Sequence, residues 1–165
     1  MKTLLPSLAL VLVAFSQMPA AMAAGDGDVA VRLEASKVVA QAGGESLQPA
    51  TAARPGDTVE YRATYTNRGK SVARNVEATL PIPAGTLVYL PATARPAAVL
   101  ASLDGSRFAP VPLTRTVIRA DGTKEPQAVP YAEYRYLRWP LGDLSPGAST
   151  TVRARMGMTN GEKQP

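Results

Sequence analysis

Two segments in which a Pro-Gly turn leads directly into an alternating run constrain the fold of this chain most strongly. The first covers residues 53–69, A-R-P-G-D-T-V-E-Y-R-A-T-Y-T-N-R-G, and the second covers residues 134–158. In such turns proline sets φ and glycine takes the position that needs a positive φ. Alternation of apolar and polar residues is typical of a strand with one buried face. We therefore expect strands joined by tight turns, with these segments at the two ends of one β-sandwich.

Weaker patterns predict the other strands. We expect strands at residues 28–39, 73–80 and 86–90, a hairpin around Asp104-Gly105, and a long loop or irregular hairpin around Asp121-Gly122. Residues 41–54 are rich in Gly, Ala and Pro and predict a loop. About seven to nine short strands without a helix indicate an all-β, immunoglobulin-like β-sandwich. Its expected core includes Tyr61, Tyr65, Leu137, Trp139 and Val152.

The first 23 residues have the three parts of a secretory signal peptide. Lys2 is followed by an apolar stretch at residues 4–15, and Ala21-Met22-Ala23 is a small-x-small cleavage site. A stretch of this length is shorter than the roughly 20 residues that span a bilayer, so we expect no transmembrane segment in the mature chain. The chain contains no cysteine, which excludes disulfides. We expect an exported protein of the periplasm or cell surface.

These patterns divide the chain into four parts. We expect a signal peptide at 1–23, an N-terminal strand and linker at 24–52, the sandwich at 53–158 together with strand 28–39, and a flexible tail at 159–165. Removal of Lys2 with the signal peptide lowers the 18 basic residues to 17 against 13 acidic ones, a formal net charge of +4. This charge permits anionic partners such as acidic glycans without requiring one.

The residue types present exclude several kinds of chemistry. Without His and Cys, the usual zinc and copper ligands and the Ser-His-Asp and Cys-His nucleophiles are missing. No nucleotide-binding glycine motif occurs, and we expect no catalytic residue, no cofactor, no metal and no nucleic-acid partner. A glycosidase with paired carboxylates stays open as an alternative. Its candidates are Glu60, Glu77, Asp104, Asp121, Glu133 and Asp143.

Calcium at the ends of the sandwich is a second open alternative. Asp26 and Asp28 are close in sequence, and Asp57 and Asp143 lie at predicted turns. Calcium needs six to eight oxygen ligands, of which the side chains here supply few. We favour hydrogen bonds from turn amides to Asp57 and Asp143.

Arginine and tyrosine residues on the predicted strands suggest an interaction face. Arg153 and Arg155 project from one side of the last strand by period two, and Arg138 shares its parity with Tyr134 and Tyr136. Such a face suits an anionic glycan or an envelope protein. A solvated strand face is the alternative. The candidate residues are Arg62, Arg135, Arg138, Arg153, Arg155, Tyr134 and Tyr136.

Four short motifs, in order, resemble those of a known family. They are P-G-D-x-V-x-Y at 55–61, T-N-x-G at 66–69, L-P-x-P-x-G at 80–85 and W-x-L-G-D-L-x-P-G at 139–147. Over residues 53–158 the chain resembles the conserved-repeat domain of bacterial surface proteins, catalogued as domain of unknown function 11. The resemblance implies an immunoglobulin-like sandwich on an exported protein and no enzyme activity. This chain carries one copy, whereas the family often has tandem copies.

The combined hypothesis is an exported, non-catalytic module for binding or structural interaction in the bacterial cell envelope. A small envelope glycosidase and a secretion or pilus accessory subunit are the alternatives. Recognition is expected from loops, from the basic face, or from an edge strand at 86–90 that pairs with another chain. The sequence leaves the oligomeric state open.

Overall fold

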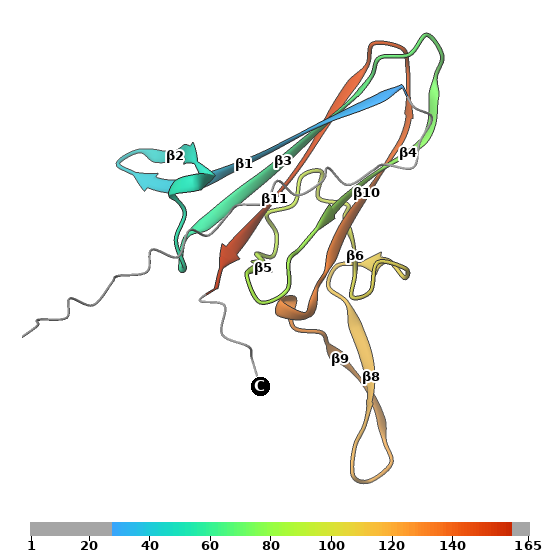
Figure 1. Cartoon of the computed structure of the whole chain (residues 1–165). Coiled ribbons are helices and arrows are strands. Elements are labelled where there is room, and N and C mark those ends of the chain that lie inside the picture. The colour runs from blue at the N-terminus through green and yellow to red at the C-terminus, as the bar shows by residue number, and fades with distance from the viewer. Residues whose placement is uncertain (1–27, 160–165) are drawn as a thin grey trace, which may run out of the picture.

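The structure, a computed structural model, describes residues 28–159. The predicted signal peptide and all but the first residue of the predicted tail lie outside the described residues. Two antiparallel sheets form the body of the molecule, and a separate hairpin projects from it (Figure 1). The all-β sandwich predicted from the sequence is confirmed, with eleven strands rather than seven to nine.

The larger sheet has five strands. In spatial order these are β2 (Gly44–Pro49), β1 (Val29–Gln41), β3 (Thr58–Asn67), β11 (Ser149–Met158) and β5 (Leu87–Tyr89). The smaller sheet has four strands, in the order β4 (Ala73–Pro81), β10 (Tyr136–Leu144), β6 (Leu100–Ser102) and β7 (Ala109–Pro110). The projecting hairpin consists of β8 (Thr114–Ile118) and β9 (Lys124–Ala128).

The two Pro-Gly segments are neighbours in the larger sheet, because β3 pairs with β11 along most of its length. The turn that precedes each of these strands also donates a hydrogen bond to the last residue of the other strand. The N–H of Gly56 donates to the carbonyl of Met158 at 2.9 Å, and the N–H of Gly147 donates to the carbonyl of Asn67 at 2.9 Å. Both glycines have positive φ, as the turn chemistry predicts.

Two connections cross from one sheet to the other at the same end of the sandwich, β3 to β4 and β10 to β11 (Figure 1). The fully buried Asn67 joins them. Its Nδ2 donates to the carbonyls of Ser71 and Leu144, both at 2.8 Å, and its Oδ1 accepts from the N–H of Gly69 at 2.9 Å. The T-N-x-G motif therefore has a structural role in this chain.

The core lies between the inner faces of the two sheets. Tyr65, Leu137, Trp139 and Val152 are buried there as predicted, and Tyr61 is partly buried against them. The indole Nε1 of Trp139 donates to the carbonyl of Pro96 at 2.9 Å, so the one polar atom of this ring is satisfied.

The predicted loop at residues 41–54 is wrong in part. Strand β2 and a single 3-10 turn, Ala50–Ala52, lie within it, and β2 pairs with the second half of β1. Gly43 and Gly44, both with positive φ, reverse the chain between the two strands. Because β2 is mostly exposed, its pairing depends on backbone hydrogen bonds and leaves no apolar alternation in the sequence.

Candidate functional site

The outer face of the larger sheet carries a cluster of charges on neighbouring strands. Period two places Glu60 and Arg62 of β3 on this face, and the register pairs them with Arg155 and Arg153 of β11. Three predicted site residues, Arg62, Arg153 and Arg155, are therefore brought together around one carboxylate.

Glu60 is the centre of this cluster and is only 3% exposed. Its Oε1 accepts from Arg62 Nη2 at 3.0 Å, and its Oε2 accepts from Arg155 Nε at 3.1 Å. Burial alone would raise the pKa of Glu60, but the hydrogen bonds from Arg62 and Arg155 and the charge of Arg153 outweigh it. The pKa therefore lies below its ordinary value, and Glu60 is ionised at neutral pH.

Arg155 also holds a second carboxylate, which comes from β2. Its Nη1 and Nη2 donate to the two carboxylate oxygens of Glu45 at 3.0 and 2.7 Å, a bidentate geometry. The hydrogen bond from Arg155 holds the pKa of Glu45 below its ordinary value, and the bond to Glu45 raises the pKa of Arg155. An exposed carboxylate is thus already bound at one point of the cluster.

A hollow of about 270 Å³ opens beside these arginines. We call it the arginine hollow, and it is lined by Ala92, Thr93, Arg95, Arg153 and Arg155. An isolated bridge between Arg95 and Arg153, with N–H···O distances of 2.8 Å in both directions, attaches the 91–96 segment to the edge of β11.

Arg153 and Arg95 are the cations in this hollow that the described residues compensate least. The carboxylate oxygen nearest to Arg153, on Glu60, is 3.8 Å away, which is too long for a hydrogen bond. Among residues 28–159 the guanidinium of Arg153 donates no side-chain hydrogen bond. In the described part of the chain, the side chain of Arg95 is bound only to the neutral carbonyls of Ala92 and Ala94. The arginine hollow therefore presents positive charge that the described residues compensate only in part.

The predicted residues on β10 lie on the opposite face of the sandwich. Tyr136 and Arg138 are on the outer side of the smaller sheet, where Arg138 lies 3.6 Å from the ring centroid of Phe108. Arg138 also pairs with Glu77 at 3.0 Å and donates to Thr79 at 3.1 Å. The two groups of arginines are not one face, because β10 and β11 belong to different sheets.

Tyr134 was predicted on an outer face, and this is wrong. Its side chain is fully buried, and its hydroxyl accepts a hydrogen bond from the N–H of Leu113 at 2.6 Å. The 3-10 turn Tyr131–Glu133 precedes it, so β10 begins only at Tyr136 and the alternation does not extend back to Tyr134. Its ring packs with those of Tyr89 and Tyr131.

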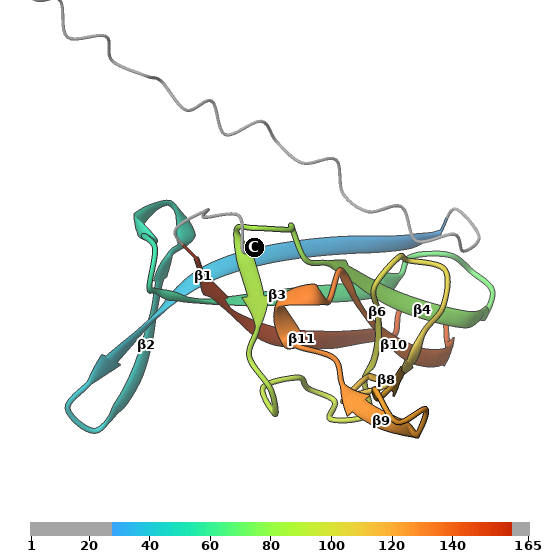
Figure 2. The same ribbon diagram turned by 90° about the horizontal axis from the view of Figure 1, so that it is seen from below.

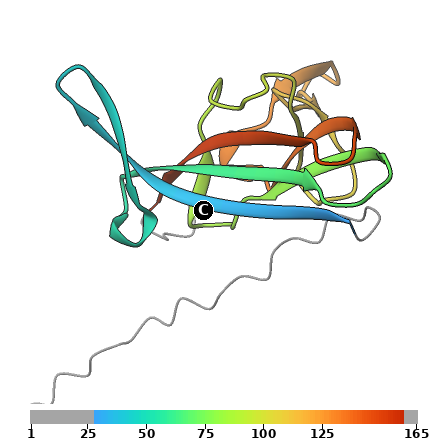
Figure 3. The same cartoon turned by 90° about the horizontal axis from the view of Figure 1, so that it is seen from above.

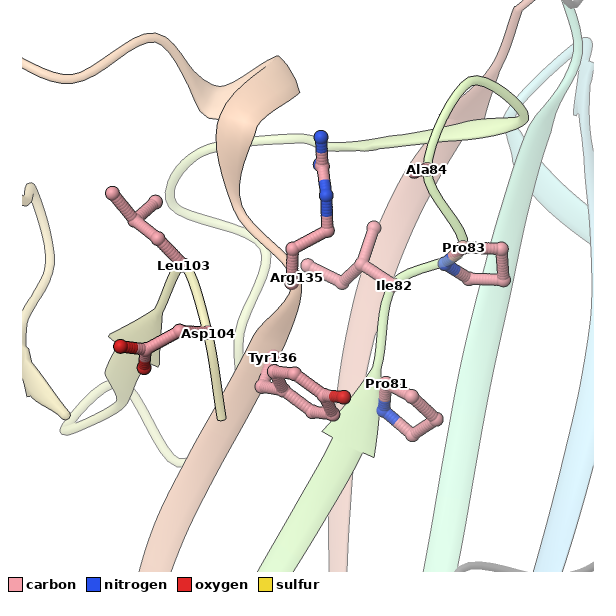
Figure 4. A pocket seen from close by; sticks show the side chains of 8 residues that line it. All are labelled: Pro81, Ile82, Pro83, Ala84, Leu103, Asp104, Arg135 and Tyr136. Atoms are coloured by element: carbon pink, nitrogen blue, oxygen red, sulfur yellow. The ribbon is translucent and has the colours of Figure 1, made fainter. Parts of the chain in front are cut away.

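A second hollow, of about 350 Å³, lies where β4 ends and β10 begins (Figure 4). We call it the proline hollow, and it is lined by Pro81, Ile82, Pro83, Ala84, Leu103, Asp104, Arg135 and Tyr136. Arg135 donates here to the carbonyls of Ala132 and Tyr134, and Asp104 accepts from the N–H groups of its own turn. One cation and one anion give this hollow no net charge.

The candidate carboxylates of the glycosidase alternative all have local partners. Asp104 accepts hydrogen bonds from the N–H groups of Arg107 and Ser106, and these bonds lower its pKa. Asp121 accepts from the hydroxyl and the N–H of Thr123, and these bonds lower the pKa of Asp121. Glu60, Glu77, Glu133 and Asp143 form ion pairs with arginines.

The turn carboxylates proposed for calcium also have local partners. Asp57 accepts from the N–H of Arg54 and pairs with Lys37, and Asp143 accepts from the N–H of Asn75. Asp26 lies outside the described residues. Within residues 28–159, no three His, Cys, Asp or Glu side chains are grouped so as to hold a metal ion. No helix in the same range is long and apolar enough to cross a membrane.

Comparisons of the chain with protein-family models, curated proteins and solved structures find no match. The resemblance to the conserved-repeat domain stays a prediction, and function has to be argued from the site itself.

Three residues of the site carried no usable signal in the sequence. Thr93 and Arg95 lie in an irregular segment, and Glu45 lies in the predicted loop. Their approach to β11 depends on pairing between residues distant in the chain, which periodicity within one segment does not reveal.

Proposed function

We propose that this protein is an exported, non-catalytic binding module that holds a carboxylate of an acidic envelope glycan in the arginine hollow. The observation that carries the proposal is Arg153, whose guanidinium lines the hollow beside Arg95 and Arg155 and, within residues 28–159, has only a 3.8 Å ion pair with Glu60 and no side-chain hydrogen bond. A guanidinium offers several donors in a planar arrangement that matches a carboxylate.

The bidentate contact between Glu45 and Arg155 supports this choice of ligand chemistry. It is a carboxylate bound by the same cluster in the geometry expected of a ligand. The proline hollow is a weaker candidate, because its two charged groups are of opposite sign and have local partners.

Binding of polygalacturonate oligosaccharides, measured by isothermal titration calorimetry at low and high salt, tests the proposal. Neutral dextran oligosaccharides serve as the ligand control. We expect binding of the acidic sugar only, weakened by salt because the contact is partly exposed. Loss of a charge-assisted hydrogen bond in Arg153→Gln should weaken binding about tenfold or more.

Arg74→Gln is the matched control, because it removes one exposed arginine from the other sheet. It should bind like the wild type. If both variants lose the same affinity for polygalacturonate, net charge alone attracts the sugar. If neutral dextran binds as tightly as polygalacturonate, the arginine hollow is not a carboxylate-binding site.

A further inference from the structure

The first half of β1 has a free edge. Residues 36–41 pair with β2 on one side, and β3 pairs on the other side along residues 29–38. Within the described part of the chain, residues 29–35 therefore have no partner strand on the side of β2. Figures 2 and 3 show β1 running along the margin of the molecule. Unpaired strand edges are templates for strand addition.

The side chains of this edge alternate in character. Leu33, on the same side of the sheet as the core, is 48% exposed. Its neighbours Arg32 and Glu34 project from the other side and pair with each other at 2.8 Å. An exposed leucine at an open edge is an aggregation hazard unless a partner covers it.

We infer that this edge pairs with the same edge of a second copy of the chain, antiparallel and with the two-fold axis at Leu33. Leu33 would then face Leu33 of the other copy. Arg32 of each copy would lie opposite Glu34 of the other, so that four charges alternate in sign around the axis. Opposite charges directly across a strand pair are stabilising, and like charges are destabilising.

Other symmetric registers are poorer. An axis at Arg32 places two arginines opposite each other, and an axis at Glu34 does the same with two glutamates. An axis at Val31 puts Glu34 opposite Asp28. An axis at Ala35 leaves only the Ala35 pair clear of β2, whereas the axis at Leu33 leaves the pairs from Val31 to Ala35 clear of it. The sequence of this edge is self-complementary in one register, which favours a second copy over a partner of different sequence.

The dimer joins the two larger sheets into one and leaves the arginine hollow open, because β3 separates β1 from β11. The ladder is short, extending from Val31 to Ala35 in each copy. We therefore expect a weak, concentration-dependent dimer.

Sedimentation equilibrium of the purified protein over concentrations up to about 1 mM tests the inference. The wild type should dimerise, whereas Arg32→Glu and Glu34→Arg should each be monomeric because like charges then meet across the axis. An equimolar mixture of these two variants should dimerise, and the double variant R32E/E34R should regain the wild-type association.

Leu33→Ser should also weaken the dimer at least severalfold. Leu47→Ser is its matched control, because Leu47 is 49% exposed on β2 and lies outside the pairing. A wild-type chain that stays monomeric at every concentration would overturn the inference. The edge would then be covered by a different partner or by another part of this chain. Association that ignores the charge reversals would overturn it equally.

Discussion

At the scale of single residues, Glu60 shows how a charged group is buried in this fold. Its position on the outer side of β3 predicts exposure, yet arginines from β3 and β11 cover it. Alternation identifies the face on which a side chain lies. It does not report that long side chains on a neighbouring strand fold over it, so this burial could not be predicted from sequence.

Replacement of Glu60 by Gln should lower the free energy of unfolding by about 2–3 kcal/mol, since the neutral amide keeps an acceptor oxygen for only one of the two arginines and turns an NH2 group toward the other. Urea denaturation of the variant and the wild type at neutral pH measures this difference in the free energy of unfolding. Glu133→Gln, which removes an exposed partner of Arg115, should change the value by less than about 1 kcal/mol.

The same carboxylate predicts a pH dependence. The pKa of Glu60 in the folded chain lies below its ordinary value of 4.5, so its stabilisation is fully present above about pH 4.5. It is lost as the pH falls through the lower, folded-state pKa. E60Q should therefore lose less stability than the wild type over this acidic range, and parallel pH profiles for the two proteins would contradict the assignment.

Glu45 competes with any external anion for Arg155. The Glu45→Gln variant removes the internal carboxylate while it retains the length of the side chain. It should therefore bind polygalacturonate oligosaccharides several times more tightly than the wild type, as measured by calorimetry. Unchanged or weaker binding would mean that Arg155 takes no part in recognition.

At the scale of elements, turn chemistry and alternation predicted most strands but not how they are distributed between sheets. The Asp104-Gly105 hairpin is confirmed, and the Asp121-Gly122 segment forms β8 and β9. The arginines of β10 and β11 were expected to share a surface and lie instead on opposite faces. Parity within a strand does not tell which sheet the strand joins, and that assignment depends on the two crossing connections near Asn67.

The importance of those connections can be measured at Asn67. Asn67→Ala leaves the buried carbonyl of Leu144 and the N–H of Gly69 without their partner and should lower the free energy of unfolding by about 2–4 kcal/mol. Ser71→Ala keeps the carbonyl that Asn67 binds and should cost less than about 0.5 kcal/mol. If both variants lose a similar amount of unfolding free energy, the effect comes from changes in the exposed loop and not from the hydrogen bonds by which Asn67 joins the two connections.

At the scale of the whole molecule, the core, the arginine hollow and the free edge of β1 occupy separate parts of the sandwich. The inner faces form the core, the edge beside β11 forms the arginine hollow, and the free edge of β1 lies two strands away. The proposed glycan site and the proposed dimer contact therefore do not compete, and each can be removed by substitution without loss of the other.

The measurement that most directly tests the proposed site is NMR of the arginine side-chain Nε–H groups during titration with polygalacturonate oligosaccharides. We predict saturable shifts of the Arg153 and Arg95 signals, with those of Arg74 and Arg138 unchanged. Shifts confined to Arg138, or spread evenly over all exposed arginines, would contradict a binding site in the arginine hollow.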